Sequence, residues 1–271
     1  MKKIAVVTGA SSGLGEEFTK QISIQSTFDE IWIIARREDK LISLANSLNS
    51  QLNKELIRPI AMDISGKDGV ERFNQFIESE NLKLKNSNET LEIGLFVNNA
   101  GFGTYGPFTE TSYKREMEMI DLNCTTLTGL CGIIIPYMKN GSVLINTASL
   151  AGYMPLGNFA VYAASKAYAL NFTIALAAEL KEKGIKVCAL CPGSVSTEFS
   201  NVASNGARKE VKGGISTEKV VRQCLKRAYK GKKTSLLRFK WKFNSFLSRI
   251  VGRYTVARFT YKFNPRPHNP D

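Results

Sequence analysis

The chain has 271 residues, of which 43% are hydrophobic and 23% are charged, with a formal net charge of +13. This length fits one α/β domain or two small domains with a large buried core, which excludes a disulfide-stapled mini-protein, a coiled coil, a collagen-like fibre and a mostly disordered chain. The positive charge belongs to one end, because residues 1–203 contain 19 lysines and arginines against 21 acidic residues, whereas residues 204–271 contain 18 against 3.

Other classes of protein are disfavoured by smaller features. We find no apolar run of the roughly 18 residues that a membrane span needs, and the apolar start ends too early for a signal peptide, so we expect a cytosolic protein. Cys188 and Cys191 form a Cys-x-x-Cys motif, but on a strand their side chains would point to opposite faces, which argues against a redox pair or zinc site. The only histidine, His268, lies near the C-terminus, which argues against a Ser-His-Asp hydrolase and a histidine-ligated metal centre.

Strand-like and helix-like segments alternate through the first two hundred residues. Strands are expected at 4–8, 31–35, 56–62, 93–97, 142–146 and 185–190, and helices near 13–25, 37–50, 67–81, 112–138 and 160–183. Several strands are apolar throughout, as in a parallel sheet that is covered on both faces. The alternation predicts an α/β fold, a Rossmann-type, doubly wound parallel sheet of about seven strands, with a helical C-terminal extension.

The pattern changes after residue 193. Residues 198–215 are small and polar, and we expect a mobile loop there. A helix should follow over Thr217–Tyr229, with Ser216 or Thr217 as its N-cap. The basic segment 230–233 ends that helix, so we divide the chain into a main domain, 1–230, and a basic extension, 231–271.

A glycine-rich turn follows the first expected strand and opens the first expected helix. Glycines let the backbone turn tightly and let a pyrophosphate approach the amides, while the helix N-terminus offers unpaired N–H groups and a positive dipole end. The motif predicts a dinucleotide site, although a plain glycine turn is the alternative, since the spacing is G-x-x-x-G-x-G. Its candidate residues are Gly9, Ser11, Ser12, Gly13, Leu14 and Gly15.

The end of the second expected strand indicates which dinucleotide is bound. An NAD site has an acidic residue here that binds the ribose 2′-hydroxyl, but Ala35 stands in that place and Arg36 and Arg37 follow. A guanidinium can bind a 2′-phosphate through two parallel hydrogen bonds, so the sequence favours NADP(H), with solvated arginines as the alternative. Asp63, followed by Ile64, could accept a hydrogen bond from the adenine amino group, or could form an Asx turn or helix cap.

Tyr162 and Lys166 lie one helical turn apart and therefore share a face of their helix. An ammonium near a phenol favours the phenolate and lowers its pKa towards a range that suits acid–base chemistry. A tyrosine and a lysine at this spacing often occur by chance on a helix surface and do not by themselves indicate a catalytic site. Here four further motifs accompany the pair, at or between strand ends. They are Asn98-Asn99-Ala100-Gly101, Asn123, Asn146-Thr147-Ala148-Ser149 and Pro192-Gly193-Ser194-Val195-Ser196-Thr197.

In order, spacing and context, these motifs resemble the short-chain dehydrogenase/reductase family over roughly residues 1–230. The resemblance implies that Tyr162 is the proton donor or acceptor, that Ser149 holds the substrate oxygen, and that Lys166 binds the nicotinamide ribose and depresses the tyrosine pKa. It implies that Asn123 orders a water in a proton relay, where a polar residue at a helix kink is the alternative. The cofactor would also be contacted by Asn98, Asn99, Ala100, Gly101, Pro192, Gly193, Val195 and Thr197.

The resemblance implies an NADP(H)-dependent enzyme that reduces a carbonyl or oxidises the alcohol. Its rivals are an NAD(H)-dependent alcohol dehydrogenase of the same family and a non-catalytic cofactor-binding protein that acts through its basic tail. The loop 198–215 is a candidate lid over the substrate. Apolar residues near the site either pack in the core or line a pocket for a steroid, acyl or aromatic ketone: Phe102, Tyr105, Phe108, Tyr153, Met154, Leu156 and Phe159.

Apolar residues recur at helical spacing through the extension, and basic residues fall largely elsewhere on the wheel, which predicts one basic amphipathic helix. The apolar positions are Leu236, Phe239, Phe243, Phe246 or Leu247, Ile250, Tyr254 and Ala257. This stripe could pack on the main domain or another subunit, or contact an anionic membrane, whereas no motif for nucleic-acid binding accompanies the charge. The family resemblance also implies a homodimer or homotetramer, assembled through the helices 112–138 and 160–183.

Overall fold

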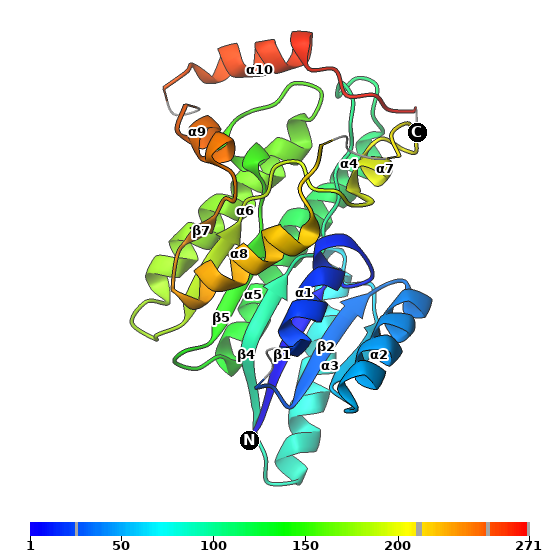
Figure 1. Cartoon of the computed structure of the whole chain (residues 1–271), viewed down its shortest axis with the longest axis vertical. Helices are drawn as coiled ribbons and strands as arrows, with labels where there is room; N and C mark the ends of the chain where they lie inside the picture. Colours follow the sequence, from blue (N-terminus) through cyan, green and yellow to red (C-terminus); the bar gives the residue numbers. More distant parts are fainter. Residues whose placement is uncertain (25–26, 210–212, 248–249, 270–271) are drawn as a thin grey trace.

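Seven parallel strands form the sheet in the part of the chain that the computed structural model describes, which is residues 1–24, 27–209, 213–247 and 250–269. The strands are β1 Lys2–Thr8, β2 Glu30–Ala35, β3 Ile57–Ala61, β4 Leu91–Asn98, β5 Val143–Thr147, β6 Lys186–Leu190 and β7 Thr234–Ser235. Their order in the sheet is β3-β2-β1-β4-β5-β6-β7 (Figure 1). The predicted Rossmann-type fold is therefore confirmed.

Helices cover both faces of the sheet. One face carries α1 Gly13–Ile24, α2 Glu38–Leu52 and α8 Thr217–Tyr229, and the other carries α3 Gly66–Asn86, α5 Leu127–Ile134 and α6 Ala160–Glu179. In Figure 1 α1 and α8 lie in front of the sheet. Along β1, Ala5 and Val7 face the first set, whereas Ile4 and Val6 face the second. All four are fully buried, which explains why the strand is apolar without alternation.

The strand order fixes where a ligand can bind. The chain moves outward from β1 to β3 and then returns to β4 on the other side of β1. The loops that leave the carboxyl ends of β1 and β4 consequently diverge, and a crevice opens between them. The glycine-rich turn follows β1 and the Asn98–Gly101 motif closes β4, so both motifs lie at this crevice.

The helix expected over 112–138 is interrupted. α4 Tyr113–Ile120 passes into a π-helical turn, Asp121–Thr126, before α5 and a 3₁₀ turn, Ile135–Tyr137. Contrary to the expectation from sequence, the run Tyr113–Tyr137, with a hydropathy of 1.4, is long and apolar enough to cross a membrane. The run packs against α3 and α6, so it is also one of the helices that cover the sheet. Core helices of this kind can be as long and as apolar as a membrane span.

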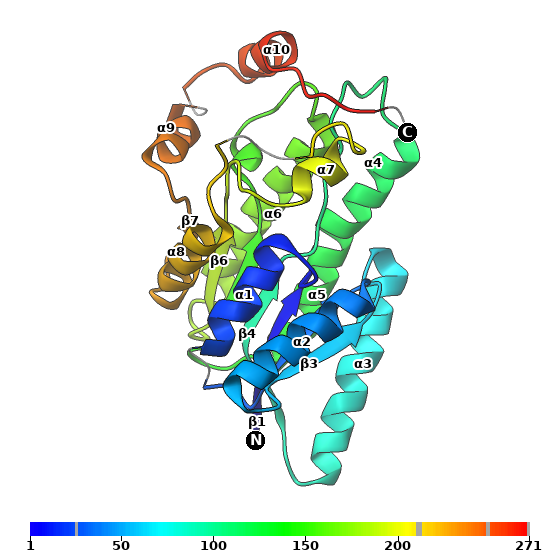
Figure 2. The same ribbon diagram turned by 45° about the vertical axis from the view of Figure 1, so that its right-hand side comes forward.

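The extension forms two helices, so the prediction of a single amphipathic helix is wrong. α9 Phe239–Leu247 and α10 Arg253–Phe263 run in different directions (Figures 1 and 2). Gly252 precedes α10 with an extended backbone, ψ 131°, and this conformation ends the helical periodicity. Most of the apolar stripe stays exposed in the single chain, and the buried aromatic residue of α9 is Trp241, which the stripe did not include.

The loop expected over 198–215 is more ordered than predicted. It contains α7 Phe199–Ala203, and Val195 pairs with Ile215 in an isolated parallel bridge. Residues 210–212 of the predicted loop lie outside the described residues. The strand β7 lies beyond residue 230, where we placed the end of the main domain, and it pairs with β6.

Candidate active site

A cavity of about 1300 Å³ extends along the carboxyl ends of the strands, from the glycine-rich turn to Tyr162. Most of the site residues expected from the sequence line this cavity, and the exceptions are Gly15, Asn98 and Asn123. The expected residues that line it are Gly9, Ser11, Ser12, Gly13, Leu14, Arg36, Arg37, Asp63, Ile64, Asn99, Ala100, Gly101, Ser149, Tyr162, Lys166, Pro192, Gly193, Val195 and Thr197.

The glycines of the first turn are required by geometry. Gly9 and Gly13 have positive φ angles, +66° and +57°, which favour glycine. A Cβ on Gly9 would lie 2.9 Å from the Ala100 Cα atom, and a Cβ on Gly13 would lie 3.2 Å from the Thr197 Cγ2 atom. Gly15 faces away from the cavity, and its missing Cβ lets α1 pack against the Gly9 carbonyl.

The motif after β4 divides between the cavity and the core. The Thr8 hydroxyl accepts hydrogen bonds from the backbone N–H groups of Asn99 and Ala100, at 2.9 and 3.1 Å. These bonds hold the motif against the glycine-rich turn. Asn98 does not line the cavity, contrary to the expectation, because its Nδ2 donates to the Leu127 carbonyl at 3.1 Å. Asn98 is therefore a buried link between β4 and α5.

The two arginines after β2 differ in their partners. Arg37 donates to the Ser11 hydroxyl at 3.1 Å and pairs with Glu198 at 3.1 Å, so it ties the glycine-rich turn to the segment after β6. Arg36 is exposed, lines the cavity and has no hydrogen bond or ion pair to the described residues. Two roles were expected for Asp63, a contact with the adenine and an Asx turn, and its position allows both. It lines the cavity and accepts a hydrogen bond from the Ser65 N–H at 3.0 Å in an Asx turn.

Ser149, Tyr162 and Lys166 meet at the other end of the cavity. Ser149 follows β5, and its hydroxyl accepts from the Ala151 N–H at 3.1 Å and forms a hydrogen bond with Tyr162. Tyr162 and Lys166 lie one turn apart on the buried side of α6. The Lys166 Nζ donates to the carbonyl oxygen of Thr147 at 2.9 Å, so the end of β5 orients both the serine and the lysine.

The pKa of Tyr162 differs from the expectation. Burial raises the pKa of Tyr162 to about 12, whereas the hydrogen bond from Ser149 and the positive charge of Arg266 act to lower it. Burial also lowers the pKa of Lys166 to about 8. The expected net lowering of the tyrosine pKa is therefore wrong, because loss of hydration outweighs the hydrogen bond from Ser149 and the charge of Arg266.

Asn123, which we expected to order a water in a proton relay, does not line the cavity. It lies in the π-helical turn and is 1% exposed. Its amide donates to the Phe102 carbonyl at 2.9 Å and to the Ser165 hydroxyl at 3.0 Å, and its Oδ1 accepts from the Phe102 N–H at 3.2 Å. The side chain thus fixes the loop after β4 against α6, which matches the alternative of a polar residue at a helix kink.

The end of the cavity at Tyr162 is largely aromatic. Phe159 stacks on Tyr162 with ring centroids 4.1 Å apart, and Phe199 of α7 lies 5.4 Å from Tyr162. Of the apolar residues expected here, those that line the cavity are Phe102, Tyr105, Met154, Leu156 and Phe159. Phe108 and Tyr153 do not line it, and Phe108 is exposed on its loop.

The extension contributes residues that sequence reasoning missed. The cavity is also lined by Arg238, Lys240, Trp241, Asn244, Asn264 and Arg266. A Cβ on Gly193 would lie 2.5 Å from Trp241 Nε1, so that glycine is needed for the close approach of α9. In the sequence, the one indication of the contact between Trp241 and Gly193 is that Trp241 lies outside the apolar stripe of the extension.

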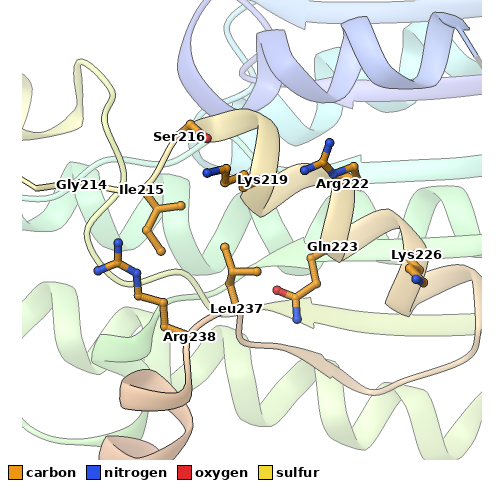
Figure 3. A pocket seen from close by; sticks show the side chains of 9 residues that line it. All are labelled: Gly214, Ile215, Ser216, Lys219, Arg222, Gln223, Lys226, Leu237 and Arg238. Carbon is orange, nitrogen blue, oxygen red and sulfur yellow. The ribbon is translucent and has the colours of Figure 1, made fainter.

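A second, open cleft of about 700 Å³ lies between α8 and the segment that leads into α9. Figure 3 shows Lys219, Arg222 and Gln223 on α8, with Leu237 and Arg238 opposite. Arg222 pairs with Glu218 at 2.9 Å. Arg238 lines both this cleft and the main cavity, so the segment before α9 separates the two spaces.

The fold and the cavity define a class, the nicotinamide-cofactor-binding oxidoreductases with a Rossmann-type sheet. The family model described as short chain dehydrogenase matches residues 3–207, and the chain belongs to the short-chain dehydrogenase/reductase family.

Particular relatives place this chain among proteins with different cofactors and substrates. A very-long-chain 3-oxoacyl-CoA reductase of Neurospora crassa is 29% identical over 73% of this chain and 58% of its own length. A short-chain dehydrogenase from Sphingobium yanoikuyae in complex with NADPH has a TM-score of 0.76 at 22% identity, with 92% and 93% of the two chains covered. A short-chain dehydrogenase/reductase from Burkholderia phymatum in complex with NAD has a TM-score of 0.79 at 18% identity, with 100% and 98% covered.

Proposed function

We propose that this chain is an NADP(H)-dependent reductase of a hydrophobic ketone, with Tyr162 as the proton donor. The observation that carries the proposal is the shape of one continuous cavity. Ser149, Tyr162 and Lys166 converge at one of its ends, and the glycine-rich turn with Arg36 forms the other. A dinucleotide in this cavity would place its nicotinamide beside the tyrosine and its adenosine beside the arginine.

The residues at the first end fit a dinucleotide phosphate. Gly9 and Gly13 leave a cradle that a Cβ would fill, and the N-terminus of α1 directs unpaired N–H groups into it. The choice of NADP(H) over NAD(H) rests on Arg36, an exposed guanidinium beside Ala35 rather than beside an acid. Arg37 is engaged by Ser11 and Glu198, which leaves Arg36 to bind a 2′-phosphate.

The protein residues supply binding and proton transfer. When bound, the dinucleotide supplies the hydride. Tyr162 keeps its proton at neutral pH because its pKa is about 12, so it can donate that proton to a ketone oxygen. Ser149 can hold the same oxygen and stabilise negative charge as it develops there. Lys166 has a pKa of about 8, and its ammonium can stabilise the phenolate that remains and hold ribose hydroxyls.

The lining of the substrate end supports an apolar substrate. Phe102, Met154, Leu156, Phe159 and Phe199 surround the space in front of Tyr162. Burial of an apolar group against such residues stabilises binding by about 25 cal/mol for each Å² removed from water. The acyl class among the expected ketones agrees with the name of the Neurospora relative, a 3-oxoacyl-CoA reductase.

A carbonyl panel, assayed with NADPH and NADH side by side, tests this function. We expect NADPH to be oxidised with at least one hydrophobic ketone, and we expect the matched NADH reaction to be slower. A faster NADH reaction would remove the cofactor assignment. Binding of either dinucleotide without turnover of any carbonyl would instead favour a non-catalytic, cofactor-binding protein.

We also propose that the chain forms a homodimer or homotetramer through α4, α5 and α6. Two of these helices, α4 and α6, expose apolar side chains, namely Tyr113, Met117, Ile120, Tyr168 and Ile174. Light scattering after gel filtration should give a mass of two or four chains. A mass of one chain at micromolar concentration would contradict this assembly.

For location, we propose a cytosolic enzyme whose extension touches an anionic membrane surface. α9 and α10 expose Phe243, Phe246, Phe259 and Phe263 among basic residues, and such a surface is attracted to anionic lipid. Sedimentation with vesicles that contain phosphatidylserine should carry the chain down in low salt and release it in high salt. Equal sedimentation with neutral vesicles would contradict the electrostatic part of this contact.

A further inference from the structure

The chain after α10 is fixed across the substrate end of the cavity. α10 is anchored where the Gly157 N–H donates to the Thr260 hydroxyl at 2.9 Å. Beyond it, Asn269 donates from its backbone N–H to the Ser204 carbonyl at 3.0 Å, and His268 lies 3.4 Å from a Glu110 carboxylate oxygen. In both views the chain runs back from α10 towards α4 and α7 (Figures 1 and 2). Arg266 lies between these anchors.

Arg266 places a guanidinium inside the cavity, beside the reaction site. Its Cζ atom lies 4.4 Å from the ring centroid of Phe159 and 5.0 Å from that of Tyr105. It forms a hydrogen bond with Tyr105, and Phe159 stacks in turn on Tyr162. The positive charge is thus one aromatic ring away from the phenol that we propose as the proton donor.

The hydrogen-bonding capacity of Arg266 is incompletely used. Its Nε atom is buried and has no acceptor, and among the described residues the arginine has no carboxylate partner in an ion pair. A half-buried guanidinium with an unused donor is costly, and a purely structural arginine would be expected to pair with an acid. Aromatic rings on its sides stabilise the cation, and Arg266 lines the cavity, where a ligand with a negative charge could approach the guanidinium.

We propose that Arg266 binds a carboxylate of the substrate, so that the preferred substrate is a hydrophobic oxo acid whose ketone meets Tyr162 and Ser149. The proposal deepens the proposed function and rests on it for the position of the ketone. A carboxylate is the favoured partner because it is planar and accepts two parallel N–H donors from a guanidinium. The apolar lining then contacts the chain between the two ends of the substrate.

Calorimetry with octanoate and octanol, without added dinucleotide, tests the proposal directly. The two probes share their alkyl chain and differ in charge. We expect octanoate to bind at least tenfold more tightly than octanol, and we expect Arg266→Met to abolish that preference, since a charge-assisted hydrogen bond is lost. Arg266→Lys, which keeps the charge but not the planar fork, should retain part of it.

Arg258→Met is the matched control, because Arg258 is an exposed tail arginine outside the cavity. It should leave the preference unchanged, which separates the cavity from the charged tail. The melting temperature of each variant shows whether the chain still folds. The proposal is overturned if the native chain shows no preference for octanoate, or if Arg266→Met weakens both probes equally.

The same variants separate this proposal from the proposed function. Reduction of an oxo acid should lose at least tenfold in kcat/KM in Arg266→Met relative to reduction of its methyl ester, mainly through KM. Ketone reduction without any acid preference would overturn the role of Arg266 and keep the reductase. An intact octanoate preference in a chain that reduces no ketone would overturn the reductase instead.

Discussion

The first two hundred residues and the C-terminal extension line one cavity, but they do so by different means. In the first region, polar residues stand where parallel strands end, so the sheet itself brings the glycine-rich turn, Ser149 and Tyr162 together. In the extension, Trp241 and Arg266 reach the cavity only because two helices and their anchors carry them back over it. Motifs thus reveal residues whose place is tied to backbone geometry, whereas the lining from the extension depends on how two helices pack over the cavity.

The two regions also differ in their charge. Residues 1–203 are close to neutral and residues 204–271 hold the excess of lysine and arginine. Much of that excess lies in the open cleft of α8 or on exposed helices, where salt screens it. Arg266 is an exception, because it is half-buried beside aromatic rings in the cavity, where we propose that it binds the substrate.

The largest effect is expected in the first region, from Tyr162→Phe. The substitution removes the hydroxyl that donates the proton and keeps the ring that stacks on Phe159. We expect kcat to fall roughly 10²- to 10⁴-fold, the usual contribution of a general acid. NADPH binding, followed by its fluorescence, should stay within a few fold of the native value. Near-native turnover in this variant would remove Tyr162 as the proton donor.

The next effect concerns the cofactor. Arg36→Gln removes the exposed guanidinium, and we expect the ratio of kcat/KM for NADPH over NADH to fall about tenfold to a hundredfold, since a hydrogen bond to a charged group contributes about 1.5–3 kcal/mol. Arg37→Gln is the comparison, because Arg37 already pairs with Glu198. A greater loss of preference in the Arg37 variant would reverse the assignment of the two arginines.

The third prediction connects the extension to the proton donor. The positive charge of Arg266 acts to lower the pKa of Tyr162, which burial raises to about 12. Alcohol oxidation needs the phenolate, so its rate should rise with pH, and Arg266→Met should move that rise to higher pH. The pH dependence of kcat/KM for a neutral alcohol measures the shift. An unchanged profile would show that the extension does not act on the tyrosine.

The smallest effect on activity is expected at an ion pair far from the cavity. Arg58 on β3 pairs with Glu80 on α3, which lowers the pKa of Glu80 to about 2 from an ordinary value of 4.5. This stabilisation is present above pH 4.5 and is lost as the pH falls through about 2. Because Arg58 is 37% exposed, Glu80→Gln should cost about 1 kcal/mol in urea unfolding at pH 7. A change in kcat would show that this pair is coupled to the site.

The sequence predicted those parts of the site whose position follows from local backbone geometry, at a turn after a strand or along one helix. Gly9 and Gly13 need positive φ angles, and the spacing of Tyr162 and Lys166 places both on the buried side of α6. Asn98 and Asn123 do not line the cavity, because the direction of a buried polar side chain depends on its neighbours, here Leu127 and the loop at Phe102. The role of Asn123 in a proton relay stays a prediction.

Other differences have equally specific causes. The pKa of Tyr162 could not be anticipated from Lys166 alone, since burial decides it. The single helix expected in the extension ignored the extended backbone at Gly252, which separates α9 from α10. Arg266 follows no motif, and its position depends on its neighbours His268 and Asn269, which contact Glu110 and Ser204, far away in the sequence.

Transfer of deuterium from NADPH that carries deuterium at both C4 positions tests the central claim most directly. The native chain and Tyr162→Phe are each incubated with a hydrophobic ketone, and the alcohol is analysed by mass spectrometry. The account predicts one deuterium on the carbinol carbon with the native chain, and almost no product from a variant that still binds NADPH. Product that carries deuterium at the native rate from the phenylalanine variant would contradict it.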